Sequence, residues 1–235
     1  MSWFTAAEEA LAEIKKTWRT YYPCHQTRLV ECRITPLKAM KQIGPTCGLV
    51  ALCMAEPLMD LNESQTTIDL MYKEAKKRGF TKLGEMFFMS YMYEMADLFL
   101  ADTYTICHVN QSMSKDTSLV KKLLKEDCLL IVCYDDDKNM MPTVNQGHTA
   151  HWAIICGIIG EDHVIARHGK KSKYGIWSLA DLAASNDGLI EVKHALAFDS
   201  DQYVIPENGD LQKTLASQFM VLKPKTTPKV VRAMF

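Results

Sequence analysis

Apolar residues recur with a helical period through the first hundred residues of the chain. Residues 3–18 place their apolar side chains on one face and lysines on another, which predicts an amphipathic helix. Residues 28–34 ("RLVECRI") are typical of a short strand or extended arm. High apolar density without breakers predicts a buried helix from residue 47 to about residue 59, stopped near Pro57.

Two more helices are predicted before residue 100. Residues 63–79 carry lysines late, and Gly79 is a natural C-terminal stop. Residues 85–99 hold methionines at steps of three. Such steps drift by about 60° each on a helix of 3.6 residues per turn, so Met86 and Met95 would face opposite ways. This favours a helix buried nearly all round over a methionine binding stripe.

After residue 100 the pattern changes to apolar runs of strand length. Strands are predicted at 104–109, 128–134, 151–159, 163–168, 174–179 and 218–224. Residues 116–127 predict a short helix, and Ser178 begins the capping box of another over about 179–185.

Helices first and strands later predict one α+β domain, 1–235. We expect a helical lobe over about 1–100, a mostly sheet lobe over about 101–225 and a flexible tail over 226–235.

The composition narrows the class of protein. With 48% hydrophobic and 23% charged residues among 235, the chain can bury a sizeable core. A net charge of -1 gives no global field for nucleic acid or membranes, and no apolar run is long enough to span a bilayer. The eight scattered cysteines are typical of reduced thiols, and the N-terminus does not have the pattern of a secretory signal. We expect a cytoplasmic protein, or one secreted by an unusual route.

Residues 42–55 ("QIGPTCGLVALCMA") place one cysteine between a rigid turn and an apolar helix. Cys47 would lie in the first helical turn, capped by Thr46, where unpaired N–H groups favour a thiolate. Lowering its pKa by about four units takes about 5 kcal/mol. A helix terminus supplies up to about 2 kcal/mol, so a contacting histidine cation would supply the remainder. Gln42 could pair with the Cys47 backbone N–H to hold an oxyanion. A small core cysteine at a helix start explains this stretch equally well.

His151 is the candidate partner, because it opens a strongly apolar run. Strand residues alternate faces, so its imidazole can point to a cleft while its neighbours pack. His148, three residues earlier, is the rival. A lone strand histidine is more often a hydrogen-bonded structural residue, so His151 indicates catalysis only in combination with Cys47.

Together, Gln42, the Cys47-Gly48 pair, His151 and Gly157 resemble the papain-like cysteine peptidases, most closely the branch that includes the bacteriocin-leader-processing peptidases. The resemblance covers about residues 40–180. It implies a two-lobed papain-like fold, in which the helical lobe carries the nucleophile helix and an antiparallel sheet carries the histidine. It also implies that Cys47 is the nucleophile, His151 the general base and acid, and Gln42 the oxyanion donor.

Three segments are similar to the actin maturation proteases of animals: "GPTCGLVALCMA", "GHTAHWAII" and "VIARHGKKSKYGIWSL". This resemblance implies that the enzyme removes an acetylated N-terminal residue, acetyl-Met or acetyl-Cys, from actin. We expect actin as substrate and partner, a monomer, and no cofactor. The alternative is a catalytically silent papain-like binder of actin or acidic N-terminal peptides, but the presence of all three site residues favours the enzyme.

The third catalytic group is open. Papain-like enzymes place an Asn or Asp about sixteen residues after the histidine, where this chain has Arg167 and His168, neither a standard orienter. His148, Asn145 or a backbone carbonyl could orient the imidazole instead.

Residues 167–173 ("RHGKKSK") predict a basic hairpin beside His151. Its Arg167, Lys170, Lys171 and Lys173 could attract the acidic N-terminus of actin, although a solvated turn would have the same composition.

The pattern predicts no metal site. His148 and His151 lack a third ligand in register, and residues 135–137 ("DDD") lack the glycine and glutamate of a calcium loop. We expect the three aspartates to form a solvated turn.

Overall fold

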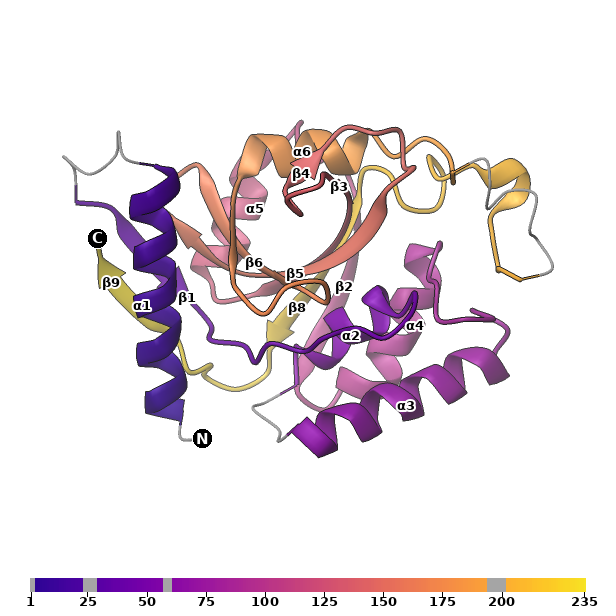
Figure 1. The fold of residues 1–235 in the computed structure, drawn as a ribbon, viewed down its shortest axis with the longest axis horizontal. Helices are drawn as coiled ribbons and strands as arrows, with labels where there is room; N and C mark the ends of the chain where they lie inside the picture. The colour runs from indigo at the N-terminus through magenta and orange to yellow at the C-terminus, as the bar shows by residue number, and fades with distance from the viewer. Residues whose placement is uncertain (1–2, 23–28, 57–60, 194–201) are drawn as a thin grey trace.

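An antiparallel sheet runs through the molecule and carries helices on both of its faces (Figure 1). The computed structural model describes residues 3–22, 29–56, 61–193 and 202–235. The strands are β1 (Glu31–Ile34), β2 (Tyr104–Asn110), β3 (Leu129–Asp136), β4 (Pro142–Thr143), β5 (Ala150–Ile159), β6 (His163–His168), β7 (Gly175–Ser178), β8 (Gln218–Pro224) and β9 (Val231–Met234). The helices are α1 (Trp3–Tyr21), α2 (Cys47–Cys53), α3 (Leu61–Lys77), α4 (Met89–Leu100), α5 (Thr117–Lys125) and α6 (Leu179–Asp187), with a 3-10 turn at Glu207–Gly209. The α+β class with an antiparallel sheet is confirmed.

The sheet follows the order β2-β8-β3-β5-β1-β9, and β6 pairs with β5 and β7. β5 is central because β3 and then β1 pair along it, and β6 also pairs with it. β1 comes from the N-terminal segment, so the predicted helical half supplies a strand to the sheet and the two halves share one core.

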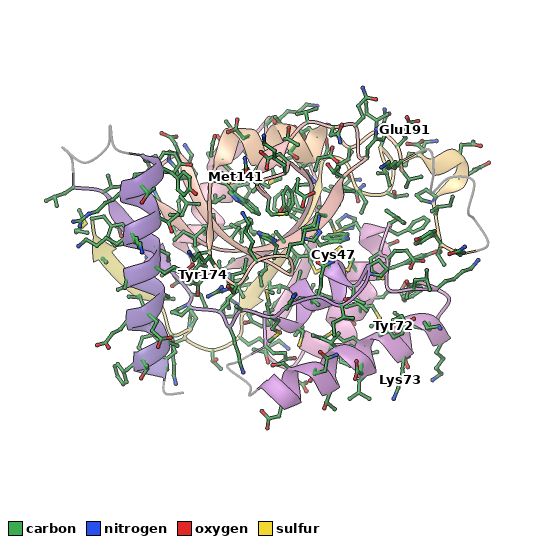
Figure 2. All side chains as sticks on the ribbon, in the orientation of Figure 1. Cys47, Tyr72, Lys73, Met141, Tyr174 and Glu191 are labelled. Carbon is green, nitrogen blue, oxygen red and sulfur yellow. The ribbon has the colours of Figure 1, made fainter. Side chains whose placement is uncertain are left out.

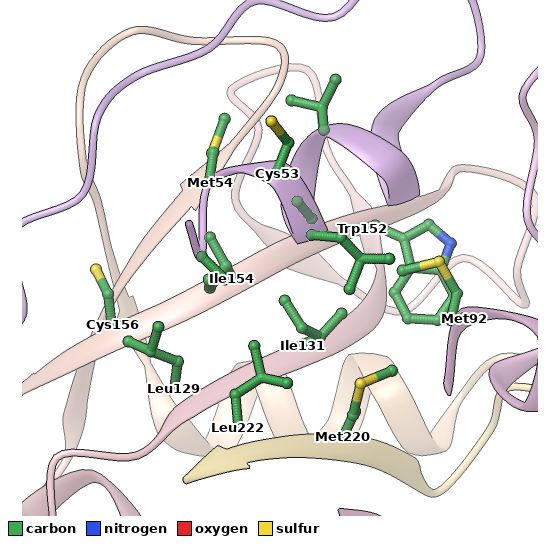
Figure 3. Packing of buried hydrophobic residues seen from close by; sticks show 14 of the residues in the cluster. Cys53, Met54, Met92, Leu129, Ile131, Trp152, Ile154, Cys156, Met220 and Leu222 are labelled. Carbon is green, nitrogen blue, oxygen red and sulfur yellow. The ribbon is translucent and has the colours of Figure 1, made fainter. Parts of the chain in front are cut away.

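Side chains of β5 alternate between two buried clusters, as the period of a strand requires. Trp152 and Ile154 face the cluster that contains α2 and α4, together with Ile131 and Met220 of neighbouring strands (Figure 3). Ala153 faces the opposite cluster, which α5 and α6 cover. The continuous apolar run of β5 therefore serves two cores at once.

Two glycines permit close approaches that position α2 and β5. A Cβ on Gly48 would lie 2.9 Å from Met92 Sδ and 3.2 Å from Trp152 Cδ1, so only glycine lets α2 pack this closely against β5. A Cβ on Gly157 would lie within 2.4 Å of the Arg33 carbonyl oxygen, where β1 pairs with β5. These contacts give a packing reason for the glycine after Cys47 and the glycine six residues after His151.

Two helices of the first hundred residues, α2 and α4, differ from their predicted extents. α2 ends at Cys53, before the predicted stop. α4 begins only at Met89, and its Ser90, Glu94 and Asp97 are exposed on one side. The expectation of a helix buried nearly all round is therefore wrong: α4 is amphipathic, and the buried Met86 lies before it.

The expected flexible tail at 226–235 is also wrong. Residues Val231–Met234 form β9, which pairs antiparallel with β1. The backbone of Phe235 exchanges hydrogen bonds with Val30 at 3.0 and 3.1 Å. A short segment without strong periodicity becomes a strand here because the edge of β1 is available to it.

None of the helices in the described residues is both long and apolar enough to cross a membrane. The seven cysteines of the described residues are free thiols, and all but Cys47 and Cys107 are buried.

Candidate active site

Cys47 is the first residue of α2, where the helices meet the sheet (Figure 2). The turn before it is closed by a bond from the Thr46 hydroxyl to the Ile43 carbonyl at 3.0 Å. Thr46 therefore does not cap the helix with its side chain, contrary to expectation. The first amides of α2 remain available to the sulfur, and the Cys47 and Gly48 N–H groups both lower the pKa of the thiol.

The Cys47 thiol lies beside β5, next to the point where the pairing of β5 with β6 begins. Ala153 is the first residue of β5 that pairs with β6. The backbone N–H of the preceding residue, Trp152, acts on the Cys47 thiol and lowers its pKa. Cys47 thus acts beside the residue that follows His151: a cysteine at a helix start lies next to the strand of the antiparallel sheet that carries this histidine.

Burial nevertheless raises the pKa of the Cys47 thiol, and it outweighs the Trp152 N–H, the Lys170 cation and the helix amides, which all lower it. Burial lowers the pKa of His151 to about 2, with further lowering by Lys170 and His168. The two groups are therefore a neutral thiol and a neutral imidazole in this state. The expected support of a thiolate by a histidine cation is absent, because burial disfavours both charges.

The His151 side chain is only 2% exposed and lies among aromatic rings. Its ring centroid is 6.0 Å from that of Tyr134, which is its direct partner across β3 and β5. The His168 ring lies 5.6 Å away on another side. Nε2 of His151 is buried and has no hydrogen-bond partner, so no hydrogen bond joins this nitrogen to Cys47.

Gln42 is held between the Cys47 turn and the residue after β6. Its backbone N–H donates to the Gly169 carbonyl at 3.0 Å, and its side-chain Nε2 donates to the Gly44 carbonyl at 3.0 Å. Gly169 is in contact with the side chain, since a Cβ there would lie 2.7 Å from Gln42 Oε1. The carboxamide is therefore within the turn that leads into Cys47, with one of its hydrogens engaged.

The acidic segment after β3 is not the solvated turn that we expected from its sequence. Asp135 is fully buried, and Asp136 is 6% exposed. The Asp135 carboxylate accepts the backbone N–H groups of Asn145, Gly147 and Thr149 at 3.0, 2.8 and 2.9 Å. It therefore organises the loop that leads into His151. Sequence reasoning missed this residue, although its place at the end of an apolar strand was a signal of burial.

The basic hairpin is divided between interior and surface. Arg167 is 7% exposed, and its guanidinium donates to the Leu37 and Ser172 carbonyls. Arg167 thus has a structural role and is not part of an exposed rim. Lys170 pairs with Asp136 at 2.6 Å, and Lys171 donates to the Asn139 carbonyl at 2.6 Å.

Beside these residues is a hollow of about 280 Å³, lined by Phe87, Ala150, Lys170 and Lys193 among others. Ala150 directly precedes His151, so the hollow adjoins the site. Among the described residues, no group of three or more His, Cys, Asp or Glu side chains could hold a metal ion.

Known proteins resemble this chain over most of its length. Residues 37–159 match the family described as actin maturation protease-like, C-terminal domain. The actin maturation protease of Drosophila melanogaster is 35% identical over 82% of this chain and 75% of its own length. That of Danio rerio is 30% identical over 79% of this chain and 72% of its own. That of Homo sapiens is 26% identical over 80% and 64%.

One solved structure, described as a C39-like peptidase from Bacillus anthracis, matches with a TM-score of 0.44 and 12% identity, covering 84% of this chain and 99% of that one. The family assignment rests on the sequence matches, because they cover most of the chain at identities of up to 35%. The chain therefore belongs to the actin maturation protease family and is a peptidase.

Proposed function

We propose that this chain is a cysteine peptidase that removes the acetylated N-terminal residue, acetyl-Met or acetyl-Cys, from actin. The observation that carries the proposal is the position of Cys47 at the start of α2, where the backbone N–H of Trp152, one residue after His151, lowers the pKa of its thiol. Relatives named actin maturation protease support the choice of substrate. The enzyme would work in the cytoplasm as a monomer, without a cofactor, nucleic acid or membrane.

Acylation begins from the neutral pair. His151 takes the thiol proton as the Cys47 sulfur attacks the carbonyl carbon of the acetylated residue. The carbonyl oxygen becomes an oxyanion, held by the Cys47 backbone N–H and the Gln42 carboxamide. The free pKa of His151 is low because the group is buried, so substrate must stabilise the developing imidazolium in the closed site.

The intermediate then collapses. The peptide C–N bond breaks, and His151 gives its proton to the nitrogen that becomes the new actin N-terminus. The acetylated residue remains as a thioester on Cys47. Water, deprotonated by His151, then hydrolyses the thioester, releasing the acetylated amino acid and restoring the thiol. Lys170 assists both steps because its charge favours anionic sulfur over the neutral thiol.

The substrate rim in this proposal consists of Lys170, Lys171 and Lys173. The charge of Lys170 is compensated by the Asp136 carboxylate. Lys171 donates to a neutral carbonyl, so its charge is not compensated by that contact. An acidic peptide entering the hollow would meet Lys170 and Lys193, which line it. Arg167 is not included, because its donors are used inside the protein.

The second candidate function is a silent binder of actin or acidic peptides. One observation favours it: the raised thiol pKa and the unpartnered His151 nitrogen are not those of a preformed ion pair. Binding without cleavage would separate the two functions.

The test is incubation with actin that carries an acetylated N-terminus, followed by mass measurement of its N-terminal peptide. We expect loss of one acetylated residue, and a fall of at least about 10³-fold in rate for Cys47→Ala at unchanged melting temperature. Cys107→Ala, which changes an exposed thiol on β2, is the matched control and should keep full activity. Actin left intact by the unmodified protein, despite binding, would establish the silent binder.

A further inference from the structure

The residues first considered for orienting His151 are engaged elsewhere. His148 Nε2 lies 3.3 Å from Glu191 Oε1, and Asn145 Nδ2 donates to Thr149 Oγ1 at 3.4 Å. Arg167 is committed to backbone carbonyls and stacks on Tyr174, with its guanidinium carbon 3.5 Å from the ring centroid. None of these contacts involves the His151 ring, so its position must come from other neighbours.

His168 is one such neighbour. It pairs with Ala153 across β5 and β6, and Ala153 is two residues beyond His151 on the same face of β5. The two imidazoles are therefore diagonal cross-strand neighbours. Their centroids lie 5.6 Å apart at an interplanar angle of 81°, which is an edge-to-face contact.

His168 is itself firmly held. Its Nδ1 accepts the Lys170 backbone N–H at 3.3 Å, and its ring stacks on Trp177 at 5.9 Å. Trp177 packs against Tyr134 at 4.8 Å, and Tyr134 contacts His151. These four rings form a closed cycle, which we call the ring quartet: Tyr134, His151, His168 and Trp177. Three of the four residues are less than 2% exposed and His151 is 2% exposed, so the quartet has little freedom to rearrange.

We propose that His168 is the positioning residue of His151, acting through the edge-to-face ring contact at the place where papain-like enzymes hold an Asn or Asp. The inference rests on the proposed function, because it assigns His168 a role only through His151 as the general base. Arg167, the other residue in this sequence window, faces away, so the structure separates two neighbours that the sequence left equivalent.

The contact can serve catalysis in two ways. It restricts rotation of the His151 ring, which keeps one nitrogen directed at the reacting proton. It also offers an aromatic neighbour when His151 becomes a cation, a contact of the cation–π kind. Burial, with the cations Lys171, Lys170 and Arg167, lowers the pKa of His168 to about 4, so this ring stays neutral near pH 7. Two further ionisable groups near His151 are Tyr134 and Lys170, the latter paired with Asp136.

The test is a double-mutant cycle with His151→Ala and His168→Ala, read by the rate of iodoacetamide alkylation at Cys47 as a function of pH. Peptide mass mapping separates Cys47 from the exposed Cys107, which is the internal reference. If His168 acts through His151, the His168 change shifts the Cys47 profile in the native background and adds nothing in the His151→Ala background. Equal shifts in both backgrounds would overturn the inference.

Cleavage kinetics provide the second readout. We expect His168→Ala to lower kcat about 10- to 100-fold with KM changed less than about 2-fold, because a freely rotating His151 ring is less often directed at the reacting proton. His168→Phe keeps the ring and the packing, so it should recover most of the kcat. A Phe variant that folds but is as slow as the Ala variant would contradict a ring contact as the cause.

His163→Ala is the matched control, since His163 lies at the other end of β6 and contacts Trp18 and Tyr22 with centroids 5.0 and 4.4 Å apart. It should leave the alkylation profile of Cys47 and the cleavage kinetics unchanged. The alkylation cycle also separates the two proposals. A non-additive cycle in a protein that cleaves no acetylated actin would remove the proposed function and keep the role of His168. An additive cycle in an active peptidase would do the reverse.

Discussion

The two proposed reacting groups both lie beside β5, but they are held by different surroundings, which form a nucleophile side and a histidine side of the candidate site. On one side, Cys47 begins a helix that packs through Gly48 against Trp152 and Met92. This nucleophile side is an apolar core of close contacts. On the other side, the ring quartet surrounds His151. This histidine side contains three buried polar atoms without hydrogen-bond partners: Tyr134 Oη, His151 Nε2 and Trp177 Nε1.

These different surroundings predict which changes each side tolerates. Close apolar packing has one good arrangement, so the nucleophile side should tolerate loss of a surface group and respond sharply to changes of volume. Buried polar atoms without hydrogen-bond partners cost free energy, so the histidine side would be stabilised by a group that bonds to them. We expect the histidine side to be less stable and more sensitive to pH.

The largest effect should come from Asp135→Ala, which breaks the support of the histidine side. Its carboxylate accepts three backbone N–H groups of the loop before His151. Each buried donor left without a partner costs about 1–3 kcal/mol, so we expect a loss of about 3–5 kcal/mol in the free energy of unfolding. Urea denaturation measures it.

Asp137→Ala is the matched control for this change. Asp137 also accepts backbone N–H groups, but from Asn139 and Met141 within its own short turn. We expect a cost of about 1 kcal/mol or less, since such a local turn is close to water. Equal losses for the two variants would show that Asp135 has no special place under His151.

On the nucleophile side, Gln42→Ala should lower kcat about 10²-fold, a cost of about 2.7 kcal/mol in the barrier, if the carboxamide holds the oxyanion. The fold should survive, because the backbone bond to Gly169 does not depend on the side chain. Steady-state kinetics with an acetylated peptide and a thermal melt measure both quantities. An unchanged kcat would mean that Gln42 only shapes the turn and that backbone donors suffice.

The same contrast explains what the sequence could and could not predict. The helices, most strands and the Cys47 helix start follow from apolar periodicity, and β6 and β8 have the predicted bounds. Periodicity carries no information about which distant residues meet. The ring contact of His168 with His151 depends on the β5–β6 register, and the pairing of β9 depends on a free edge of β1.

Charged residues show the limit most clearly. Asp135 and Arg167 have the composition of surface turns, yet both lie at strand ends and are buried, where backbone groups need partners. The sequence shows the charge and not the donors that compensate it. Gln42 and Cys47 were predictable as a pair because one short turn contains both, whereas the support of His151 comes from three separate strands.

Acid should weaken the histidine side first. Burial lowers the pKa of His151 to about 2 and that of His168 to about 4, from an ordinary value of 6.5. Below about pH 6.5 the unfolded chain binds protons on these histidines while the native chain does not, so stability falls as the pH falls. The contribution is fully present above pH 6.5 and is lost progressively as the pH falls, down to about pH 4 for His168 and about pH 2 for His151.

Between pH 6 and pH 5 we expect a loss of about 1–2 kcal/mol in the free energy of unfolding, measured by urea denaturation at matched ionic strength. His168→Phe removes one of the two histidines and should flatten this dependence. Identical urea midpoints at pH 6 and pH 5 would contradict the contrast between the two sides.

The smallest effect concerns the basic hairpin (residues 167–173), whose Lys170 lines the hollow. Lys171 and Lys173 can be changed to Gln without leaving Asp136 unpaired, because Lys170 provides its partner. We expect this pair of changes to lower kcat/KM for an acidic N-terminal peptide about 2- to 5-fold, with kcat nearly constant, since rim charges act on encounter and ground-state binding. Exposed charges are screened over about 8 Å at physiological ionic strength, so added salt should remove the difference. Lys76→Gln with Lys77→Gln, on α3, makes the same change in net charge outside the hairpin and should have no such effect. A loss that is equal for acidic and neutral peptides would instead indicate a displaced His168, and would move the hairpin from substrate attraction to support of the histidine side.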